Sequence, residues 1–203
     1  MNCETSIRCY LAEARRVMHL VNPVAMAELA EVIIATYDNG NQIFTCGNGG
    51  SAAAALHFAC DLAKHASPLG RRRLRAYSLN ANISTITAIA NDLDYRYIFS
   101  EQLSAAMEPG DLLIAISCSG NSENVLAAVE YAREHGARTA GLSGFDGGSL
   151  ALSVDYSVNV PVHHMQHAED LHLMTLHNIY LAVRAALHQR DVLLEQHEIG
   201  IGR

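Results

Sequence analysis

The stretch Leu112–Ser117 (LLIAIS) followed by Cys118–Ser122 (CSGNS) decides the fold of this chain. Its first part is a near-continuous apolar run, which is typical of a strand buried on both faces of a parallel sheet. The turn Glu108–Asp111 (EPGD) precedes the strand, and residues 122–134 predict a helix after the small-residue loop. We therefore expect a strand, a loop and a helix in succession, which is the repeating unit of an α/β protein.

The first half of the chain contains a second junction of the same kind. Residues 42–46 (QIFTC) predict a strand that runs directly into Cys46–Ser51 (CGNGGS), and Ser51 can cap a helix that extends to about His65. Similar patterns predict further strands at 75–79, 139–143 and 156–160, further helices at 5–20, 23–38, 84–91, 96–107 and 169–188, and a turn at Gly147–Gly148.

The alternation of strands and helices predicts an α/β class with a three-layer α-β-α sandwich around a five-stranded parallel sheet. The length of 203 residues suits one domain, and half of the residues are hydrophobic, which is enough for a sizeable core. We see no linker and no internal boundary. The expected organisation is a single domain over residues 1–203, with N-terminal helices in 1–40 and the α/β core in 41–203.

The charge balance bears on the possible partners. The net charge is -7, from 14 basic and 21 acidic residues, which argues against a nucleic-acid binder that neutralises phosphates. The basic run Arg71–Arg73 with Arg75 lies in a Pro/Gly-flanked stretch, and we interpret it as a solvated loop, with contact to a polyanion as the alternative.

Five cysteines without a CxxC pair favour a reducing, cytoplasmic compartment. The N-terminus has no apolar signal region, and no apolar run approaches the length of a membrane span. We expect a cytoplasmic protein with neither nucleic acid nor membrane as partner.

The two loops predict a phosphate-binding site. Each follows a strand and opens a helix, so both lie at the carboxyl edge of the sheet, where open α/β folds bind ligands. Glycines let the backbone approach an anion, and the start of a helix favours one. Hydroxyl donors are available from Ser51, Ser117, Ser119 and Ser122. The alternative is a pair of ordinary tight turns; neither loop has a nucleotide P-loop or a dinucleotide motif.

A second group of polar residues lies on two predicted helices. His57 and Asp61 are spaced i, i+4, and Glu169 and His177 are eight residues apart, so each pair shares one helix face, with His172 near the second. If the helices meet, these side chains could bind a divalent metal or move a proton. The alternative is chance, because the chain has eleven histidines.

Several other polar residues carry no such prediction. We interpret His163, His164 and His167 as surface loop residues, and Cys60 and Cys118 as small buried hydrophobes. No nucleophile elbow of a Ser-His-Asp hydrolase is visible.

On these motifs the chain resembles the sugar isomerase (SIS) domain family, and within it the phosphoheptose isomerase branch. The segments that carry the resemblance are Cys46–Ala52 (CGNGGSA), Leu56–Ala59 (LHFA), Thr87–Asp92 (TAIAND), Gly110–Ser122 (GDLLIAISCSGNS), Gly144–Gly148 (GFDGG) and the last helix. The resemblance implies a flavodoxin-like SIS fold and a homotetramer with active sites between subunits, in which the helices of residues 1–40 take part in oligomerisation. It also implies conversion of sedoheptulose 7-phosphate to D-glycero-D-manno-heptose 7-phosphate.

The resemblance also implies roles for individual residues. Asp61 is the expected base between C1 and C2, and His177 the expected proton carrier. The expected metal, zinc in some members, would be held by His57, Asp61, Glu169 and His177. The expected substrate-binding residues are Asn48, Gly49, Gly50, Ser51, Asp92, Ser117, Cys118, Ser119, Ser122 and Glu169, with Cys118 where a threonine is usual.

Besides Cys118, the chain departs from the branch at two acidic positions. The branch has glutamate where this chain has Asp61, and glutamine where it has Glu169. A shorter Asp61 holds its carboxylate about 1 Å further back, and such a displacement can cost about a hundredfold in rate. Glu169 adds a negative charge, so two histidines and two carboxylates would hold a dication as a neutral site. These departures, and a missing arginine near His65, concern the substrate more than the fold.

Two alternatives of other classes are open. Some SIS relatives are tetrameric adaptors that bind the bacterial replication initiator and have a small residue at the helix carboxylate; this chain keeps its acidic residues and both histidines, which favours an enzyme. A sugar-phosphate sensor would need a DNA-binding module from a partner, because the expected elements include none.

Overall fold

The sheet has five parallel strands. The computed structural model describes residues 2–201, with side chains through residue 193. The strands pair in the order β2-β1-β3-β4-β5, with Cys46 opposite Ala115 and Ser117 opposite Ser143. Their bounds are β1 Gln42–Gly47, β2 Arg75–Ser78, β3 Leu112–Ser117, β4 Arg138–Gly144 and β5 Tyr156–Val160. The predicted five-stranded parallel sheet of flavodoxin-like order is confirmed.

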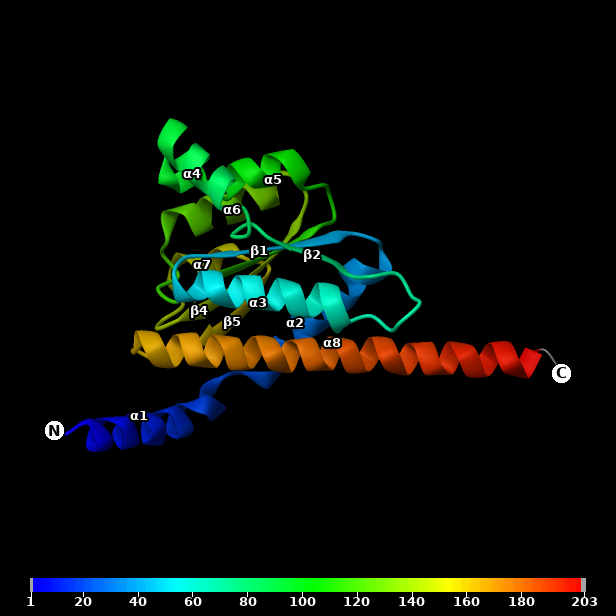
Figure 1. Ribbon diagram of the computed structural model, residues 1–203, viewed down its shortest axis with the longest axis horizontal. Helices are drawn as coiled ribbons and strands as arrows, with labels where there is room; N and C mark the ends of the chain where they lie inside the picture. The colour runs from blue at the N-terminus through cyan, green and yellow to red at the C-terminus, as the bar shows by residue number, and fades with distance from the viewer. Residues whose placement is uncertain (1, 202–203) are drawn as a thin grey trace.

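Helices cover both faces of the sheet in three layers (Figure 1). One face packs on α2 (Pro23–Asp38), α3 (Gly50–His65) and α8 (Met165–Ile201), and the other on α5 (Ser100–Ala106), α6 (Glu123–Glu134) and α7 (Gly148–Ser153). The short α4 (Ile83–Asp92) lies beyond this second layer. The apolar run of β3 serves both cores, because Ile114 points to the first face and Leu113 to the second.

Three predicted elements differ from the structure. The helix expected at 96–107 is a 3-10 turn at Tyr95–Tyr97 followed by α5. The predicted turn at Gly147–Gly148 instead opens α7. Leu150 stabilises the first turn of this helix, because its side chain is buried and its N–H donates to the Gly120 carbonyl at 2.8 Å. The last helix begins at Met165, four residues before the expected start.

The N-terminal segment makes few contacts with the core. Helix α1 (Cys3–Val17) and the 3-10 turn Met18–Leu20 lie beside the first half of α8 (Figure 1). The Tyr10 hydroxyl donates to Asp170 at 2.5 Å, and its ring stacks on His167 at 4.0 Å. His167 is buried within α8, so its interpretation as a surface loop residue was wrong. The side chains of Ile7 and Leu11 are 60% and 62% exposed.

No single helix within residues 2–201 has the length and apolar character needed to cross a membrane, although the bent pair Cys3–Leu20 and Pro23–Asp38 passes that test when the two are taken together.

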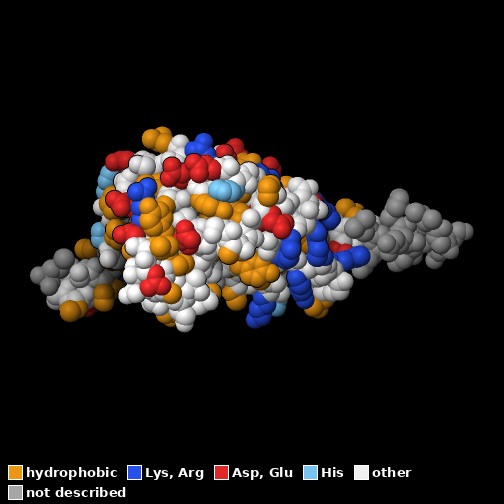
Figure 2. Space-filling model, turned by 90° about the horizontal axis from the view of Figure 1, so that it is seen from above, with side chains coloured by type: hydrophobic (Ala, Val, Ile, Leu, Met, Phe, Trp, Pro, Cys, Tyr) orange, Lys and Arg blue, Asp and Glu red, His pale blue; other side chains and the backbone are white. Residues whose placement is uncertain are grey.

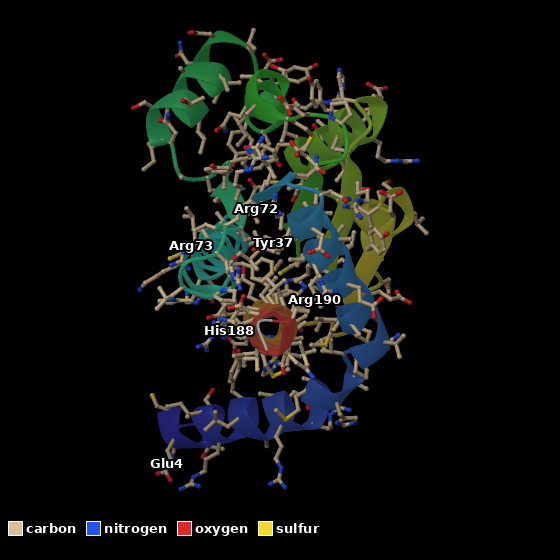
Figure 3. The ribbon with its side chains drawn as sticks, turned by 90° about the vertical axis from the view of Figure 1, so that its right-hand side faces the viewer. Glu4, Tyr37, Arg72, Arg73, His188 and Arg190 are labelled. Carbon is tan, nitrogen blue, oxygen red and sulfur yellow. The ribbon has the colours of Figure 1, made fainter. Side chains whose placement is uncertain are left out.

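The basic run before β2 is exposed, as predicted, but it is also tied to the ends of helices. Arg72 donates to the Tyr37 carbonyl near the end of α2, and Arg73 donates to the Lys64 and Ser67 carbonyls at 3.2 and 3.0 Å. Figure 3 shows Arg72 beside Tyr37 and Arg190 on α8 below them. Figure 2 shows blue basic side chains gathered on one part of the surface. Cations at helix carboxyl ends are favourable, so this run stabilises the fold.

Candidate active site

The first glycine-rich loop lies between β1 and α3. Gly49 has a φ of +54°, a conformation that glycine adopts without strain, and Gly50 is the first residue of the helix. A Cβ on Gly47 would lie 2.8 Å from the backbone of Ser51, so the turn is too tight for a side chain there. Ser51 itself is buried in the first turn of α3, where the helix dipole favours an anion.

The second loop connects β3 and α6. The Ser117 hydroxyl lies 3.4 Å from that of Ser119 and 3.1 Å from that of Ser122, so the three oxygens form one cluster. Gly120 has a φ of +66°, and a Cβ there would lie 2.0 Å from the Gly147 carbonyl oxygen. The loop owes its shape to this close contact with the segment that precedes α7.

The two loops and the start of α8 enclose a cavity of about 150 Å³. The loops meet because β1 and β3 are neighbours in a parallel sheet, which brings their carboxyl ends together. No lysine or arginine is among the described residues that line the cavity; the lining residues are Asn48, Ser51, Ser117, Cys118, Ser119, Ser122, Met165 and Glu169. The structure thus brings all four predicted phosphate-binding serines to one small space.

A thiol and a buried imidazole lie behind the serines. The Cys118 sulfur is 3.9 Å from the Ser51 hydroxyl and 3.7 Å from His172 Nδ1. Burial raises the pKa of the Cys118 thiol to about 11, so the group is a neutral thiol at neutral pH. Burial also lowers the pKa of His172, which favours its neutral form.

The sequence interpretation did not identify three residues near this cavity. Asn124 and Asn48 exchange amide hydrogen bonds, both 2.8 Å long, and the Tyr95 hydroxyl donates to the Asn48 side-chain oxygen at 3.1 Å. Met165 lines the cavity from α8. No spacing rule links Asn48 to a residue 76 positions away, so only the tertiary structure reveals these contacts.

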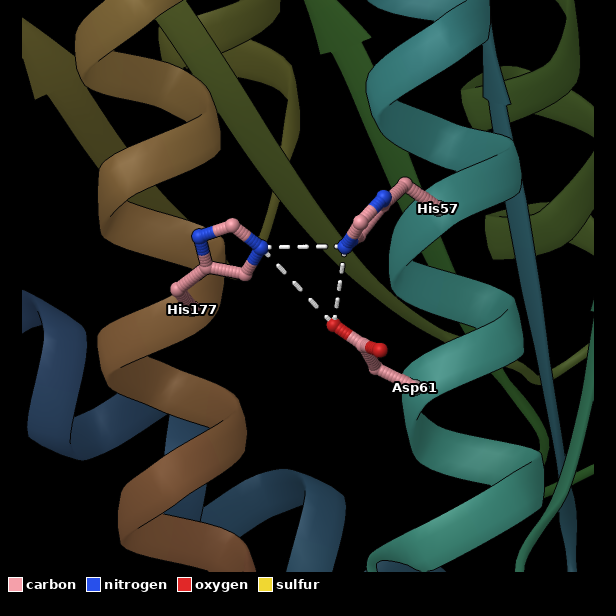
Figure 4. A group of neighbouring side chains, drawn as sticks. All are labelled: His57, Asp61 and His177. Atoms are coloured by element: carbon pink, nitrogen blue, oxygen red, sulfur yellow. Dashed lines mark hydrogen bonds and ion pairs between the residues drawn. The ribbon is translucent and has the colours of Figure 1, made fainter.

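A triad of polar side chains lies further along the same two helices. His57 and Asp61 come from α3 and His177 from α8 (Figure 4). His57 Nε2 is 3.2 Å from Asp61 Oδ2 and 3.0 Å from His177 Nε2, and His177 Nε2 is 3.9 Å from Asp61 Oδ2. The predicted condition that the two helices meet is therefore satisfied.

The triad has the donor set and spacing of a metal site. Two imidazoles and a carboxylate are ligands that zinc accepts, and in a tetrahedral site with bonds of about 2.0–2.1 Å neighbouring ligand atoms lie about 3.4 Å apart. The three observed separations of 3.0–3.9 Å bracket that value. The residues fit a divalent cation that would retain open coordination positions.

Glu169, the fourth predicted ligand, does not belong to this group. Its carboxylate lies against Gly50, since a Cβ on that glycine would be 2.4 Å from Glu169 Oε1. His57 is seven residues further along α3, which corresponds to about 10 Å at 1.5 Å per residue. Glu169 therefore faces the cavity lined by the four serines, which we call the serine cavity.

Asp92 is the other predicted site residue that lies elsewhere. It is exposed at the end of α4, where Asn91 donates to its carboxylate at 2.8 Å, and it does not line the cavity.

Comparison with known proteins agrees with this geometry. Residues 9–144 match the SIS domain family, which makes the chain a SIS domain protein. It is 42% identical over 163 residues to a phosphoheptose isomerase of Mycobacterium tuberculosis (80% of this chain, 83% of the relative) and 44% identical over 161 residues to one of Aromatoleum aromaticum (78% and 80%).

Two solved structures are also similar over most of the chain. A phosphoheptose isomerase from Francisella tularensis has a TM-score of 0.85 at 29% identity, and one from Neisseria gonorrhoeae has 0.84 at 32%; each alignment covers 91% of this chain and 100% of the other. The chain belongs to the phosphoheptose isomerase family.

Proposed function

We propose that this chain is an isomerase that converts sedoheptulose 7-phosphate, a ketose, into the aldose D-glycero-D-manno-heptose 7-phosphate. One observation carries the proposal. The serine cavity and the His57–Asp61–His177 triad lie along the same pair of helices, α3 and α8, about two turns apart.

The distance between the two sites suits a seven-carbon sugar phosphate. His57 lies about 10 Å beyond Gly50 along α3. An extended seven-carbon chain with its phosphate ester spans on the order of 10 Å, since each bond is about 1.5 Å long. With the phosphate in the serine cavity, C1 and C2 of the sugar would reach the triad.

The phosphate would be held by hydroxyls and backbone. Ser51, Ser117, Ser119 and Ser122 offer donors, and the first turns of α3 and α6 add the positive ends of two helices. Because no lysine or arginine is among the described residues lining the cavity, these neutral donors account for phosphate binding within one chain.

The proton transfers fall to the triad. Asp61 would take the proton from C1 and return it to C2 through an enediol, and His177 would carry the proton from the oxygen on C1 to the oxygen on C2. His57 contacts both groups and holds the Asp61 carboxylate in place. One proton leaves and one returns at each stage, so the reaction needs no oxidant.

We propose, as the alternative to a free Asp61 base, that His57, Asp61 and His177 hold a divalent cation, with zinc the first candidate; Asp61 is then a metal ligand, and the cation carries more of the chemistry than the bare carboxylate. A cation bound there would polarise the sugar carbonyl and stabilise negative charge on its oxygen. The donor set and its 3.0–3.9 Å spacing support this assignment.

The assembly is a further part of the proposal. The exposed apolar residues of α1, together with exposed Ile83 and Leu93 on and beside α4, would be covered in a homotetramer with active sites between subunits. All five cysteines are free, which supports a cytoplasmic location.

The test is an isomerase assay with sedoheptulose 7-phosphate on the metal-analysed protein. We expect His177→Ala to lose turnover by at least about a hundredfold while it still binds the sugar phosphate. The control is His163→Ala, since His163 pairs with Asp146 and belongs neither to the serine cavity nor to the triad. Unchanged turnover in His177→Ala would refute the assigned mechanism, and absence of turnover in the wild type would refute the substrate.

A further inference from the structure

The carboxylate of Glu169 is the only charged group among the described residues that line the serine cavity. It lies within the same 150 Å³ as Ser51 and the three serines of the second loop. A carboxylate in a phosphate site is unexpected, because like charges repel strongly at short range in a partly buried cavity.

Glu169 occupies the position that favours an anion. A Cβ on Gly50 would lie 2.4 and 2.6 Å from the two carboxylate oxygens, so the carboxylate lies directly over the first residue of the sixteen-residue helix α3. The N-terminus of a helix stabilises negative charge. Glu169 therefore places its own negative charge at the helix end where a phosphate would bind.

The negative charge of Glu169 also acts on its surroundings. It contributes, after burial, to the raised pKa of Cys118. The pKa of Tyr10 on α1 is raised mainly by its hydrogen bond to Asp170, and Glu169 adds to this shift. The cavity therefore combines neutral hydroxyl donors with a negative field from α8.

We propose that Glu169 is a specificity-determining residue that selects polyhydroxylated phosphate esters over free phosphate. The inference rests on the proposed function only in that the cavity binds phosphate. The carboxylate competes with phosphate for the start of α3. It weakens the binding of any anionic ligand that has no sugar hydroxyls to donate to it.

A sugar phosphate can offset this repulsion. Its hydroxyls can donate charge-assisted hydrogen bonds to the Glu169 carboxylate, which inorganic phosphate can do far less well at neutral pH. Specificity is a difference between two affinities, and here it arises from a repulsive element that only the correct ligand neutralises.

The test compares two ligands that cannot be isomerised, inorganic phosphate and sorbitol 6-phosphate, by isothermal titration calorimetry at fixed pH and ionic strength. In Glu169→Gln, which keeps the size and removes the charge, we expect inorganic phosphate to bind about tenfold tighter or more. Sorbitol 6-phosphate should change by less than about threefold. The matched control is Asp170→Asn, which removes the same charge one residue away, where Asp170 is exposed and contacts Tyr10.

Equal changes for the two ligands, no change for inorganic phosphate, or the same gain in Asp170→Asn would overturn the proposal. Glu169→Ala gives a second measurement if the glutamine variant has an altered melting curve, and it should also bind inorganic phosphate more tightly. Since neither ligand undergoes turnover, a failed isomerase assay with an intact phosphate effect would refute the proposed function and leave this inference standing.

Discussion

Gly120 shows how a single residue shapes the phosphate loop. Its φ is +66°, and a Cβ at this position would lie only 2.0 Å from the Gly147 carbonyl oxygen. These two features exclude any side chain. We expect Gly120→Ala to destabilise the protein by about 1–3 kcal/mol, because the neighbouring atoms are backbone and cannot turn aside. Thermal denaturation checks this, with phosphate binding as a second readout.

The matched control for that change is Gly70→Ala. Gly70 has a similar φ of +81°, but a Cβ there would meet no atom within 4 Å. The control isolates the cost of the backbone conformation from the cost of the clash, so equal losses of stability in the two variants would contradict the role assigned to the Gly147 contact.

The five cysteines should separate into two reactivity classes. Cys46 and Cys118 are buried, whereas Cys3, Cys9 and Cys60 are exposed, so the interpretation of Cys60 as a buried hydrophobe was wrong. Burial raises the pKa of Cys46 to about 12 and that of Cys118 to about 11, and the thiolate is the reactive form.

We therefore expect three fast and two slow thiols when the native protein is titrated with Ellman's reagent at pH 8. Raising the pH towards 11 should increase the rate at Cys118, because its thiolate forms only there. Denatured protein should show five fast thiols, and fast labelling of Cys118 in the native protein at pH 8 would contradict its assignment as a buried neutral thiol.

At the scale of elements, the helices α2 and α3 end against arginines of the segment before β2. Arg73 donates to the carbonyl of Lys64, in the last turn of α3, where carbonyls have no partner within the helix, and to the carbonyl of Ser67 just beyond it. We expect Arg73→Ala to lower the free energy of unfolding by about 1–2 kcal/mol, measured by urea denaturation.

The control for this change is Arg184→Ala, which removes an exposed arginine from α8. Surface substitutions of this kind usually change stability by less than about 0.5 kcal/mol. Equal effects of Arg73→Ala and Arg184→Ala would show that Arg73 stabilises the fold no more than an exposed surface arginine does, as expected for a solvated loop.

The predicted elements were confirmed where a local pattern was strong. The apolar run 112–117 and the glycine-rich turn at 47–50 each mark a boundary by their own chemistry. Strand β3 falls where expected, whereas α3 begins at Gly50 with Gly49 as its N-cap, so the prediction that Ser51 caps this helix was wrong. Helix α7 was missed because its two leading glycines read as a turn, while its stability comes from Leu150 and the Gly120 carbonyl, both tertiary contacts.

At the scale of the whole molecule, α1 and the 3-10 turn that follows it present apolar residues to solvent. Ile7, Leu11 and Met18 are between 47% and 62% exposed, and burying one such side chain contributes roughly 1.5–3 kcal/mol. If α1 lies at a subunit interface, the double substitution Ile7→Ser and Leu11→Ser should lower the mass measured by light scattering from that of a tetramer to that of a smaller species.

The control for this prediction is Arg15→Ser on the same helix, which should leave the mass unchanged. A tetramer in both variants would show that α1 is not the main contact between subunits. A monomeric wild type would contradict the proposed tetramer.

The amino-acid sequence by itself determined the order of strands and helices, the two serine–glycine loops and the pairing of His57 with Asp61, because each depends on residues close together in the chain. Only the tertiary structure decided that β1 and β3 are neighbours, so that the loops share one cavity, and that α8 lies along α3. That packing assigns His177 to the triad and Glu169 to the serine cavity. Both were predicted as metal ligands, and the register of α3 against α8, set by contacts between segments about 120 residues apart, separates them.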